Sequence, residues 1–342
     1  MCIKVAVLMS GGVDSSVAAA LLLEQGCDVI GLTMINWDTK AAQKAAEVAA
    51  GLGIKHYIID LKKEFGCLVI NYFADSYQHG FTPNPCVECN KFIKFGLLLD
   101  AAREYDCDVA ATGHYARIEY DNITNRYLLK KGVDAYKDQS YFLYGLKQEQ
   151  LAHALFPLGG MTKKEVRALA HSMDIPVADA GDSQEICFVA GDYRDFLKDR
   201  IQYKAGLVVN PEGQVLGRHH GLPFYTIGQR RGLGISYPYP LYVLGMDTDN
   251  NKLLVGAESY LYHNSLTASN NNFILIENLS QPMQVTAKIR YRAAAAPAVI
   301  SADGEKVRVD FETEQRAITP GQSVVYYHDD CVVGGGVISS VS

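Results

Sequence analysis

The segment SGGVDSS, residues 10–16, joins two glycines to three serines and an aspartate directly after an apolar run. Glycines let the backbone approach a ligand closely, and the amides of a turn bind phosphate together with the positive end of a helix. A Walker loop needs a Lys-Ser or Lys-Thr pair after its last glycine, and this segment has none. The segment therefore predicts a phosphate site of another type; the plainer alternative is a tight turn before a serine-capped helix.

A second candidate for chemistry is TPNPCVECNK, residues 82–91, in which two cysteines follow a proline-stiffened entry. We expect Cys86 near a helix cap and Cys89 in the first turn. The helix N-terminus, with Lys91 and Lys94 nearby, predicts a lowered pKa for Cys89 and a reactive thiolate. The alternatives are two small residues packed at a helix start or a structural zinc site.

A third cysteine, Cys187, stands between the apolar residues Ile186 and Phe188. This pattern fits a residue of a core strand. The other five cysteines have no partnered motif, and we expect them to serve packing: Cys2, Cys27, Cys67, Cys107 and Cys331.

These segments must be positioned by the elements around them. The pattern predicts strands at residues 4–9, 27–34, 56–60 and 109–112, and helices at 17–23, 41–52 and 91–105. Strands that alternate with helices indicate a parallel sheet covered on both faces. We expect a doubly wound α/β fold, with the phosphate loop between the first strand and its helix.

The second half of the chain has a different texture. A capping box at Thr162 and Glu165 opens a helix at 163–172. From about residue 206 the chain is rich in Gly, Pro, Tyr and Asn, with short β-type runs at 242–244 and 252–255. From about 265, alternating strands (FILI, VTAKIRYR, AVIS, VRVDF, SVVYY, GGGVIS) predict a small all-β barrel. The predicted domains are 1–200 (α/β), 201–262 (small central α+β) and 263–342 (β-barrel).

Composition limits the class of protein. The chain has 342 residues, is 48% hydrophobic, and contains no run of the ~18 apolar residues that a membrane span requires. We expect a cytoplasmic protein with no membrane partner and with reduced thiols. The net charge of −6 argues against non-specific duplex binding, although a local basic patch is compatible with it.

The heptapeptide is similar to the loop of the N-type ATP pyrophosphatases, of the adenine nucleotide α-hydrolase fold, which transfer AMP to a carbonyl oxygen. Beyond that loop, the chain resembles the tRNA-specific 2-thiouridylases over nearly its whole length. The matching segments are SGGVDSS, TPNPCVECNKFIKF, ATGHYARI, KDQSYFLY, DSQEICFV, YTIGQRRGLGI, KIRYR and ITPGQSVVYY with its following GGG.

The resemblance implies roles for individual residues. Cys89 would be the nucleophile, and Cys187 would carry a persulfide. ATP, with Mg²⁺, would meet Leu8, Met9, Ser10, Gly11, Gly12, Val13, Asp14, Ser15, Ser16, Met34 and Gly113. The target base would meet Asn84, Pro85 and Cys86, and tRNA would contact His114, Lys137, Asp138, Gln139, Arg290, Tyr291 and Gln322.

The implied reaction adenylates the C2 oxygen of the wobble uridine (position 34) and then displaces AMP with sulfur. It gives 2-thiouridine, AMP and pyrophosphate, and it closes a Cys89–Cys187 disulfide as the product leaves. The family implies tRNAs for Lys, Glu and Gln as substrates and a persulfide donor, either a cysteine desulfurase or a relay protein, as partner.

Many family members carry aspartate where this chain has Cys86. A thiolate there could accept a proton, but Cys86, Cys89 and Cys187 together could also bind a [4Fe-4S] cluster that holds sulfide. Both routes stay open at this point, with the persulfide relay preferred.

Two rival functions share parts of the pattern. Another adenylating synthetase of the pyrophosphatase type would use the phosphate loop but would not need the cysteines or KDQSYFLY. A non-catalytic, ATP-responsive tRNA-binding module would use the cysteines for structure only.

Three supporting features have plainer interpretations when the family is set aside. Lys288, Arg290 and Arg292 alternate as on a solvated strand face. The pair at 230–231 is either a phosphate clamp or a surface pair. His114, after Thr112 at a strand end where ligands of open sheets bind, could be a structural histidine.

Overall fold

The computed structural model describes residues 3–36, 40–179, 181, 186–189 and 191–341. Its first layer is a parallel sheet of strand order β3-β2-β1-β4-β7. The strands are β1 (Lys4–Leu8), β2 (Asp28–Ile35), β3 (Lys55–Asp60), β4 (Val109–Ala111) and β7 (Ala154–Leu155). The strands predicted at residues 4–9, 27–34, 56–60 and 109–112 are all present, with ends that differ by one residue.

Side chains of β1 alternate between two cores, as expected for a sheet covered on both faces. Val5 and Val7 pack with helices α1 (Val13–Glu24) and α2 (Lys40–Gly51). Ala6 and Leu8 face the opposite layer, which contains Phe73 and Ile93. The doubly wound fold predicted from the sequence is therefore confirmed.

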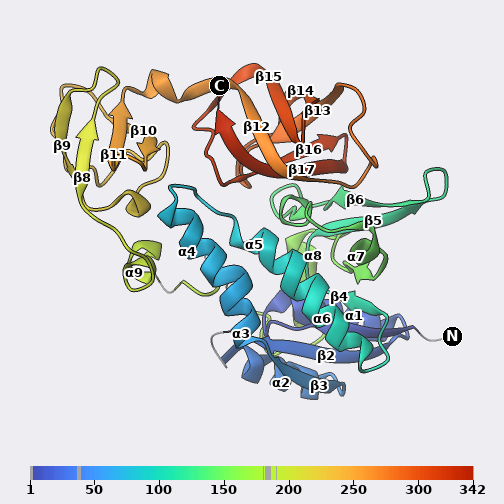
Figure 1. Ribbon diagram of the computed structural model, residues 1–342. Coiled ribbons are helices and arrows are strands. Elements are labelled where there is room, and N and C mark those ends of the chain that lie inside the picture. Colours follow the sequence, from blue (N-terminus) through green and yellow to red (C-terminus); the bar gives the residue numbers. More distant parts are fainter. Residues whose placement is uncertain (1–2, 37–39, 180, 182–185, 190, 342) are drawn as a thin grey trace.

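The opposite layer contains two long helical segments (Figure 1). One runs through α3 (Lys62–Phe65), the π-helical stretch Gly66–Ile70 and α4 (Asn71–Gln78). The other runs through α5 (Pro85–Glu88), the π-helical stretch Cys89–Leu97 and α6 (Leu98–Arg103). The sequence predicted the second segment, with a helix start near Cys86 and a helix at 91–105, but it did not predict the first.

A hairpin that the sequence did not predict links this domain to the barrel. Strands β5 (Ala116–Asp121) and β6 (Arg126–Lys131) lie between β4 and β7 in sequence, yet β6 pairs with β17 at Lys130 and Cys331. Arg117 supports the junction by donating from Nη2 to Asp330 Oδ2 at 2.7 Å. Helices α7 (Gln148–Ala152) and α8 (Lys163–Ser172) follow, and α8 begins with the predicted capping box.

The central region begins with α9 (Tyr193–Lys198) and forms a sheet of order β10-β11-β8-β9. Its strands are β8 (Gly206–Val209), β9 (Val215–His219), β10 (Tyr242–Asp247) and β11 (Lys252–Gly256). Val208, Val243 and Leu253 share one hydrophobic core with Phe73 and Ile93. The small central α+β unit is therefore packed directly on the helical layer.

The C-terminal sheet closes on itself because β12 pairs with both β15 and β17. Its strands are β12 (Tyr262–Phe273), β13 (Met283–Lys288), β14 (Ala296–Asp303), β15 (Lys306–Arg316), β16 (Ser323–His328) and β17 (Cys331–Val341). The predicted all-β barrel is thus present, but FILI, residues 273–276, is not a strand. Only Phe273 belongs to β12, a mainly polar strand whose buried side chains include Leu266 and Ala268.

A second predicted strand is present but shorter than expected. The strand expected at 285–292 ends at Lys288, so Arg290 and Arg292 do not alternate on a strand face. Beyond the strand, Arg290 Nη2 donates to the carbonyl oxygen of Arg316 at 2.8 Å and Tyr291 packs on Phe142.

Candidate active site

The phosphate loop lies at the carboxyl end of β1, where ligands of open α/β sheets bind. Gly11 adopts φ +71°, and a Cβ atom there would lie 2.7 Å from the carbonyl oxygen of Ala41. Ser15 and Ser16 both donate side-chain hydrogen bonds to the carbonyl oxygen of Gly12. Hydrogen bonds within the loop therefore fix its shape, and only glycine fits at position 11.

The predicted nucleotide contacts in this segment differ in accessibility. The side chains of Leu8, Met9 and Val13 belong to the core and are at most 8% exposed. They can offer a nucleotide only backbone atoms. Met9 already uses its backbone, because its N–H donates to Leu32 and its carbonyl oxygen accepts from Thr33 Oγ1.

Gly113, after β4, touches the start of α1. A Cβ atom there would lie 2.7 to 2.8 Å from atoms of Asp14 and Ser15. Met34 lies at the end of β2, two residues beyond Leu32, which pairs with Leu8 in the parallel register. Both residues predicted to line the nucleotide site thus lie at the same sheet edge as the loop.

The thiols form a second part of this edge. Cys86 is exposed on α5, Cys89 is buried where the helix becomes π-helical, and Cys187 is exposed in a turn. Asn36 Nδ2 lies 4.0 Å from Cys187 Sγ, which places Cys187 beside the end of β2. Cys187 is therefore not the core strand residue that its apolar neighbours also suggested; residues 182–185 of its motif lie outside the described residues.

Electrostatic interactions connect the three thiols with one another and with Lys94. Burial raises the pKa of Cys89 to about 12, while Lys94 opposes this rise and the other two thiols add to it. Cys86 and Cys187 keep exposed surface, but the protein around them removes enough water to raise the pKa values of both thiols, against the influence of Lys94. The prediction of a lowered pKa for Cys89 is therefore wrong, because loss of water around the thiol outweighs the nearby cation and the helix end.

Lys91 was expected to help lower the pKa of Cys89. Its ammonium instead lies over the ring of Phe92, 4.6 Å from the centroid. Lys94 is the relevant cation. Its Nζ lies 3.5 Å from His114 Nε2, and His114 Nδ1 lies 2.6 Å from Thr112 Oγ1. Burial and the adjacent Lys94 hold the pKa of His114 well below its usual range, so the ring is neutral at pH 7.

The loop before the cysteines is held by the barrel. Gln322 Nε2 donates to the carbonyl oxygens of Thr82 at 3.0 Å and Pro83 at 3.1 Å. Asn84 and Pro85, predicted to meet the target base, are buried next to the exposed Cys86. Gln322 therefore positions this loop in the present structure, and its predicted contact with tRNA remains a prediction.

Comparison with known proteins gives matches along the whole chain. Three family models match: tRNA methyl transferase HUP domain at residues 3–191, tRNA methyl transferase PRC-barrel domain at 194–257 and Aminomethyltransferase beta-barrel domain at 263–338. The tRNA-specific 2-thiouridylase MnmA of Syntrophomonas wolfei is 50% identical over 336 residues, covering 98% of this chain and 99% of the relative. MnmA 2 of Thermoanaerobacter sp. is 52% identical over 98% of this chain and 97% of its own, and MnmA of Acetivibrio thermocellus is 51% identical over 98% and 99%.

This chain belongs to the tRNA-specific 2-thiouridylase family.

The names of two family models refer to methyl transfer, whereas these curated relatives are named for thiolation. The residues of this 2-thiouridylase-family chain favour thiolation, because its phosphate loop and its cysteines lie at one sheet edge.

The residues predicted to contact tRNA near the catalytic domain have unequal access to solvent. Gln139 forms two hydrogen bonds with Tyr115: the Gln139 N–H donates to the Tyr115 carbonyl oxygen, and the Tyr115 N–H donates to Gln139 Oε1. Asp138 is buried and accepts from the N–H of Gly132, the N–H of Ser140 and Ser140 Oγ. Asp138 thus organises this loop, whereas the neighbouring Lys137 is partly exposed.

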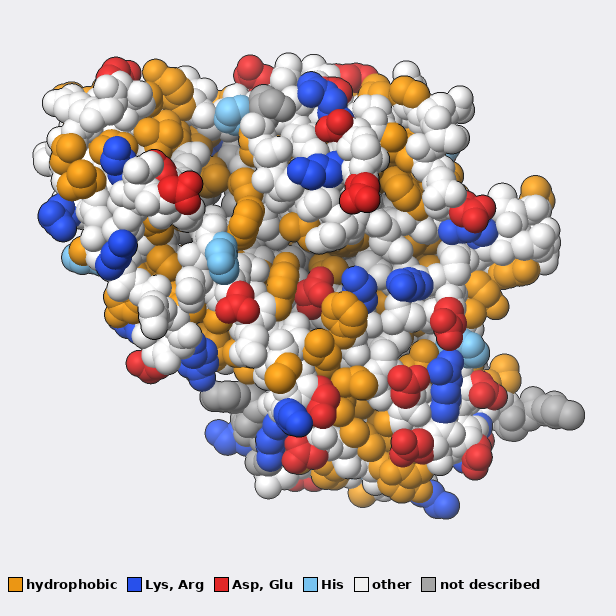
Figure 2. All heavy atoms as spheres, in the orientation of Figure 1, with side chains coloured by type: hydrophobic (Ala, Val, Ile, Leu, Met, Phe, Trp, Pro, Cys, Tyr) orange, Lys and Arg blue, Asp and Glu red, His pale blue; other side chains and the backbone are white. Residues whose placement is uncertain are grey.

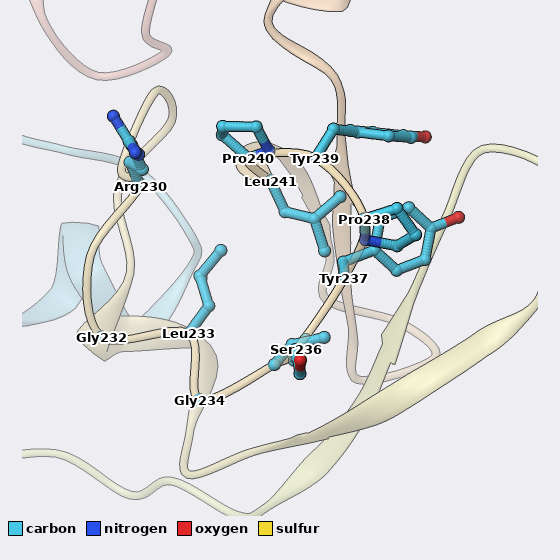
Figure 3. A pocket seen from close by; sticks show the side chains of 11 residues that line it. Arg230, Gly232, Leu233, Gly234, Ser236, Tyr237, Pro238, Tyr239, Pro240 and Leu241 are labelled. Atoms are coloured by element: carbon cyan, nitrogen blue, oxygen red, sulfur yellow. The ribbon is translucent and has the colours of Figure 1, made fainter.

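The central unit of this family member has an open pocket of about 560 Å³ in the loop between η4 (Leu222–Phe224) and β10 (Figure 3). Tyr237 and Tyr239 meet edge to face there, with ring centroids 4.8 Å apart, and Arg230 lies across the opening. Arg231 is on the same exposed loop, where its carbonyl oxygen accepts from Gln229 Nε2. On the face drawn in Figure 2, basic and acidic side chains are interspersed, in keeping with the net charge of −6.

The same geometry bears on metal binding. Among the residues that the structure describes, no group of three or more His, Cys, Asp or Glu side chains converges as a metal site would require. All seven described cysteines are free thiols; Cys2 lies outside the described residues. The arrangement of Cys86, Cys89 and Cys187 therefore gives a [4Fe-4S] cluster no support.

The sequence missed three polar residues of this edge: Asn36, Tyr115 and Lys163. Tyr115 and Lys163 both contact Asp14, at 2.8 and 2.7 Å. They come from distant elements, so only the family motif ATGHYARI could have drawn attention to Tyr115.

Proposed function

We propose that this chain thiolates tRNA: it is a tRNA sulfurtransferase that forms 2-thiouridine at the expense of ATP. The observation that carries the proposal is that the phosphate loop and Cys187 lie at the same carboxyl edge of the parallel sheet. The phosphate loop follows β1, Gly113 packs on that loop from β4, and Cys187 lies beside Asn36 at the end of β2. An activated carbonyl and a sulfur carrier can therefore meet in one place.

The first step requires only the nucleotide site. Uracil C2 is a poor electrophile, and its oxygen is a poor leaving group. The uracil O2 bonds to the α-phosphorus of ATP, the bond from that phosphorus to the bridging oxygen breaks, pyrophosphate leaves and the uracil N3 proton is released. Backbone amides of the glycine loop and the N-terminus of α1 bind the phosphates. The Mg²⁺ that accompanies ATP would neutralise part of their charge, and Asp14 is the carboxylate of the loop.

The second step uses the thiols. The terminal sulfur of a Cys187 persulfide attacks C2, and AMP leaves with the former O2 atom. The Cys89 thiolate then attacks Cys187 Sγ, which releases 2-thiouridine and leaves a Cys89–Cys187 disulfide. An external thiol reductant supplies two electrons to restore both thiols. Because burial raises the pKa of Cys89 to about 12, Cys89 must lose a proton before it attacks.

Access of the base to this site favours an unpaired nucleotide. A base in a single-stranded anticodon loop leaves its stack at lower cost than a base in a duplex. We therefore propose the wobble uridine (position 34) of tRNAs for Lys, Glu and Gln as substrate. A cysteine desulfurase or a relay protein would deliver the persulfide sulfur to Cys187, which is exposed. Because tRNA is the substrate, we propose that the enzyme works in the cytoplasm; no helix among the described residues has the length and apolar character to cross a membrane.

The test is product analysis with a matched pair of thiol variants. We expect AMP and pyrophosphate to form only when tRNA is present, and Cys187→Ser to lose 2-thiouridine while it retains tRNA binding. Cys67→Ser, which removes an exposed thiol on the π-helical stretch Gly66–Ile70, is the control and should keep full activity. ADP as product, or full thiolation by Cys187→Ser, contradicts the proposal.

A further inference from the structure

The phosphate loop receives a lysine from a helix that is distant in sequence. Lys163, the first residue of α8, donates from Nζ to Asp14 Oδ1 at 2.7 Å. Its side chain is only 12% exposed. Tyr115 donates from its hydroxyl to the same carboxylate oxygen at 2.8 Å, and the Lys163 ammonium lies 5.9 Å from the centre of the Tyr115 ring.

The loop itself brings no cation to a polyanionic ligand. SGGVDSS contains an aspartate and lacks the lysine that a Walker loop places on the phosphates. A triphosphate held by backbone amides alone would lie beside the Asp14 carboxylate and be repelled by it. A mostly buried ammonium at this carboxylate therefore lies where the missing positive charge is needed.

We infer that Lys163 is the phosphate-binding cation of the nucleotide site, with its ammonium moving from Asp14 to the β- and γ-phosphates when ATP binds. The inference rests on the proposed function, because it requires ATP as the ligand of the loop. Lysine suits this exchange, since it acts on phosphate as a compact charge on a flexible stem.

The backbone around Lys163 is firmly held. Its N–H donates to Asp134 Oδ2 at 2.9 Å, and the preceding residue, Thr162, forms a capping box with Glu165. Only the side chain needs to rotate for the exchange, which keeps the cation close to the loop in both states.

Two other interpretations predict different behaviour. The ion pair with Asp14 could simply fasten α8 to α1, in which case loss of the charge would disturb the fold and every ligand alike. Alternatively, Lys44 could provide the charge, because its Cβ atom would lie 2.8 Å from a Cβ placed on Gly11.

The experiment measures affinity of the full chain for ATP and for adenosine by calorimetry, with Mg²⁺ and without tRNA. Lys163→Gln removes the charge and can still donate to Asp14, Lys163→Met removes both, and Lys163→Arg restores the charge. We expect both neutral variants to bind ATP about 10- to 100-fold more weakly, with unchanged adenosine affinity and near wild-type ATP binding by Lys163→Arg. Lys164→Met, on the exposed side of the same helix, is the matched control and should bind ATP like the wild type.

Unchanged ATP affinity in Lys163→Gln overturns the inference. An equal loss of ATP and adenosine affinity assigns the pair to structure and also overturns it, as does a selective loss in Lys44→Met with none in Lys163→Gln. The measurement uses neither tRNA nor sulfur. A charge-dependent loss of ATP affinity in a protein that never thiolates tRNA would therefore reject the proposed function alone.

Discussion

Gln322 of the barrel is hydrogen-bonded to Thr82 of the catalytic domain, from Nε2 to the carbonyl oxygen at 3.0 Å, 240 residues apart in sequence. The same amide group also donates to Pro83. In the reverse direction, the Thr82 N–H donates to the carbonyl oxygen of Pro320 at 2.9 Å. The segment that ends in Cys86 is thus held by the C-terminal barrel.

Replacement of Gln322 by alanine should slow thiolation more than it weakens ATP binding. The substitution leaves two partly buried carbonyl oxygens without their donor and loosens the loop that presents Cys86 and the helix of Cys89, so we expect roughly a tenfold loss in the thiolation rate. Gln315→Ala, which removes a side-chain amide that donates to Thr313, is the control. Equal rates for the two variants would show that the barrel does not position the loop.

Gly113→Ala should abolish tight ATP binding without unfolding the protein. The new methyl group would lie within 2.8 Å of Asp14 and Ser15, so the start of α1 must move, at a cost of about 1–3 kcal/mol. Gly160→Ala is the matched control, because a Cβ atom there meets nothing within 4 Å. ATP titration of both variants checks the prediction, and wild-type affinity in Gly113→Ala contradicts it.

Alkylation of Cys89 should be slow at neutral pH and rise about tenfold per pH unit between pH 7 and 9, because only the thiolate reacts. Burial raises the pKa of Cys89 from about 9 to about 12, so its thiolate is scarce below pH 9. Mass spectrometry after timed iodoacetamide pulses separates Cys89 from the exposed Cys67, which serves as an internal reference. Similar alkylation rates at the two sites at pH 7 would contradict the burial of Cys89.

The same shift affects stability. A thiol whose pKa is higher in the folded state adds to the stability of the fold. This contribution is fully present below the unfolded-state pKa of about 9 and is lost as the pH rises towards 12. The free energy of unfolding, measured with urea, should therefore fall less between pH 8 and pH 10.5 for Cys89→Ala than for the wild type.

Lys94→Met should move the thiolation profile to higher pH. The Lys94 ammonium opposes the rise in pKa of all three thiols, so its removal makes each thiolate scarcer at a given pH, and we expect thiolation at pH 7.5 to fall at least roughly fivefold. Lys91→Met is the control, since the Lys91 ammonium lies over Phe92. An unchanged pH profile in Lys94→Met would exclude Lys94 from thiol activation.

Alanine variants of Asp138 and Lys137 should distinguish a residue that stabilises the loop from a residue that contacts tRNA. Asp138→Ala leaves the N–H groups of Gly132 and Ser140 and the Ser140 hydroxyl without an acceptor, so we expect a stability loss of about 2 kcal/mol or more. Lys137→Ala should keep its stability and weaken tRNA binding about two- to tenfold, with a reduced salt dependence. Urea unfolding measures the first effect and filter binding the second. Weaker tRNA binding by an Asp138→Ala variant of unchanged stability would show that Asp138 contacts tRNA.

The sequence by itself determined the parallel sheet, the phosphate loop and the barrel, because these depend on local patterns. Alternation of apolar strands and helices, two adjacent glycines between them, and short polar-apolar strands are all readable within a few residues. Cys86 and Cys89 were likewise identified as chemical candidates from their spacing and their helix start.

Tertiary structure alone decided the chemistry of those thiols and the partners of the loop. The pKa of Cys89 depends on how much water the folded chain removes, which outweighs the helix end and Lys94. Cys187 lies beside Asn36, Lys163 beside Asp14, and Gln322 beside Thr82, at separations of 151, 149 and 240 residues. No local pattern encodes such contacts, because they form only when the sheet edge, the helices around it and the barrel have packed together.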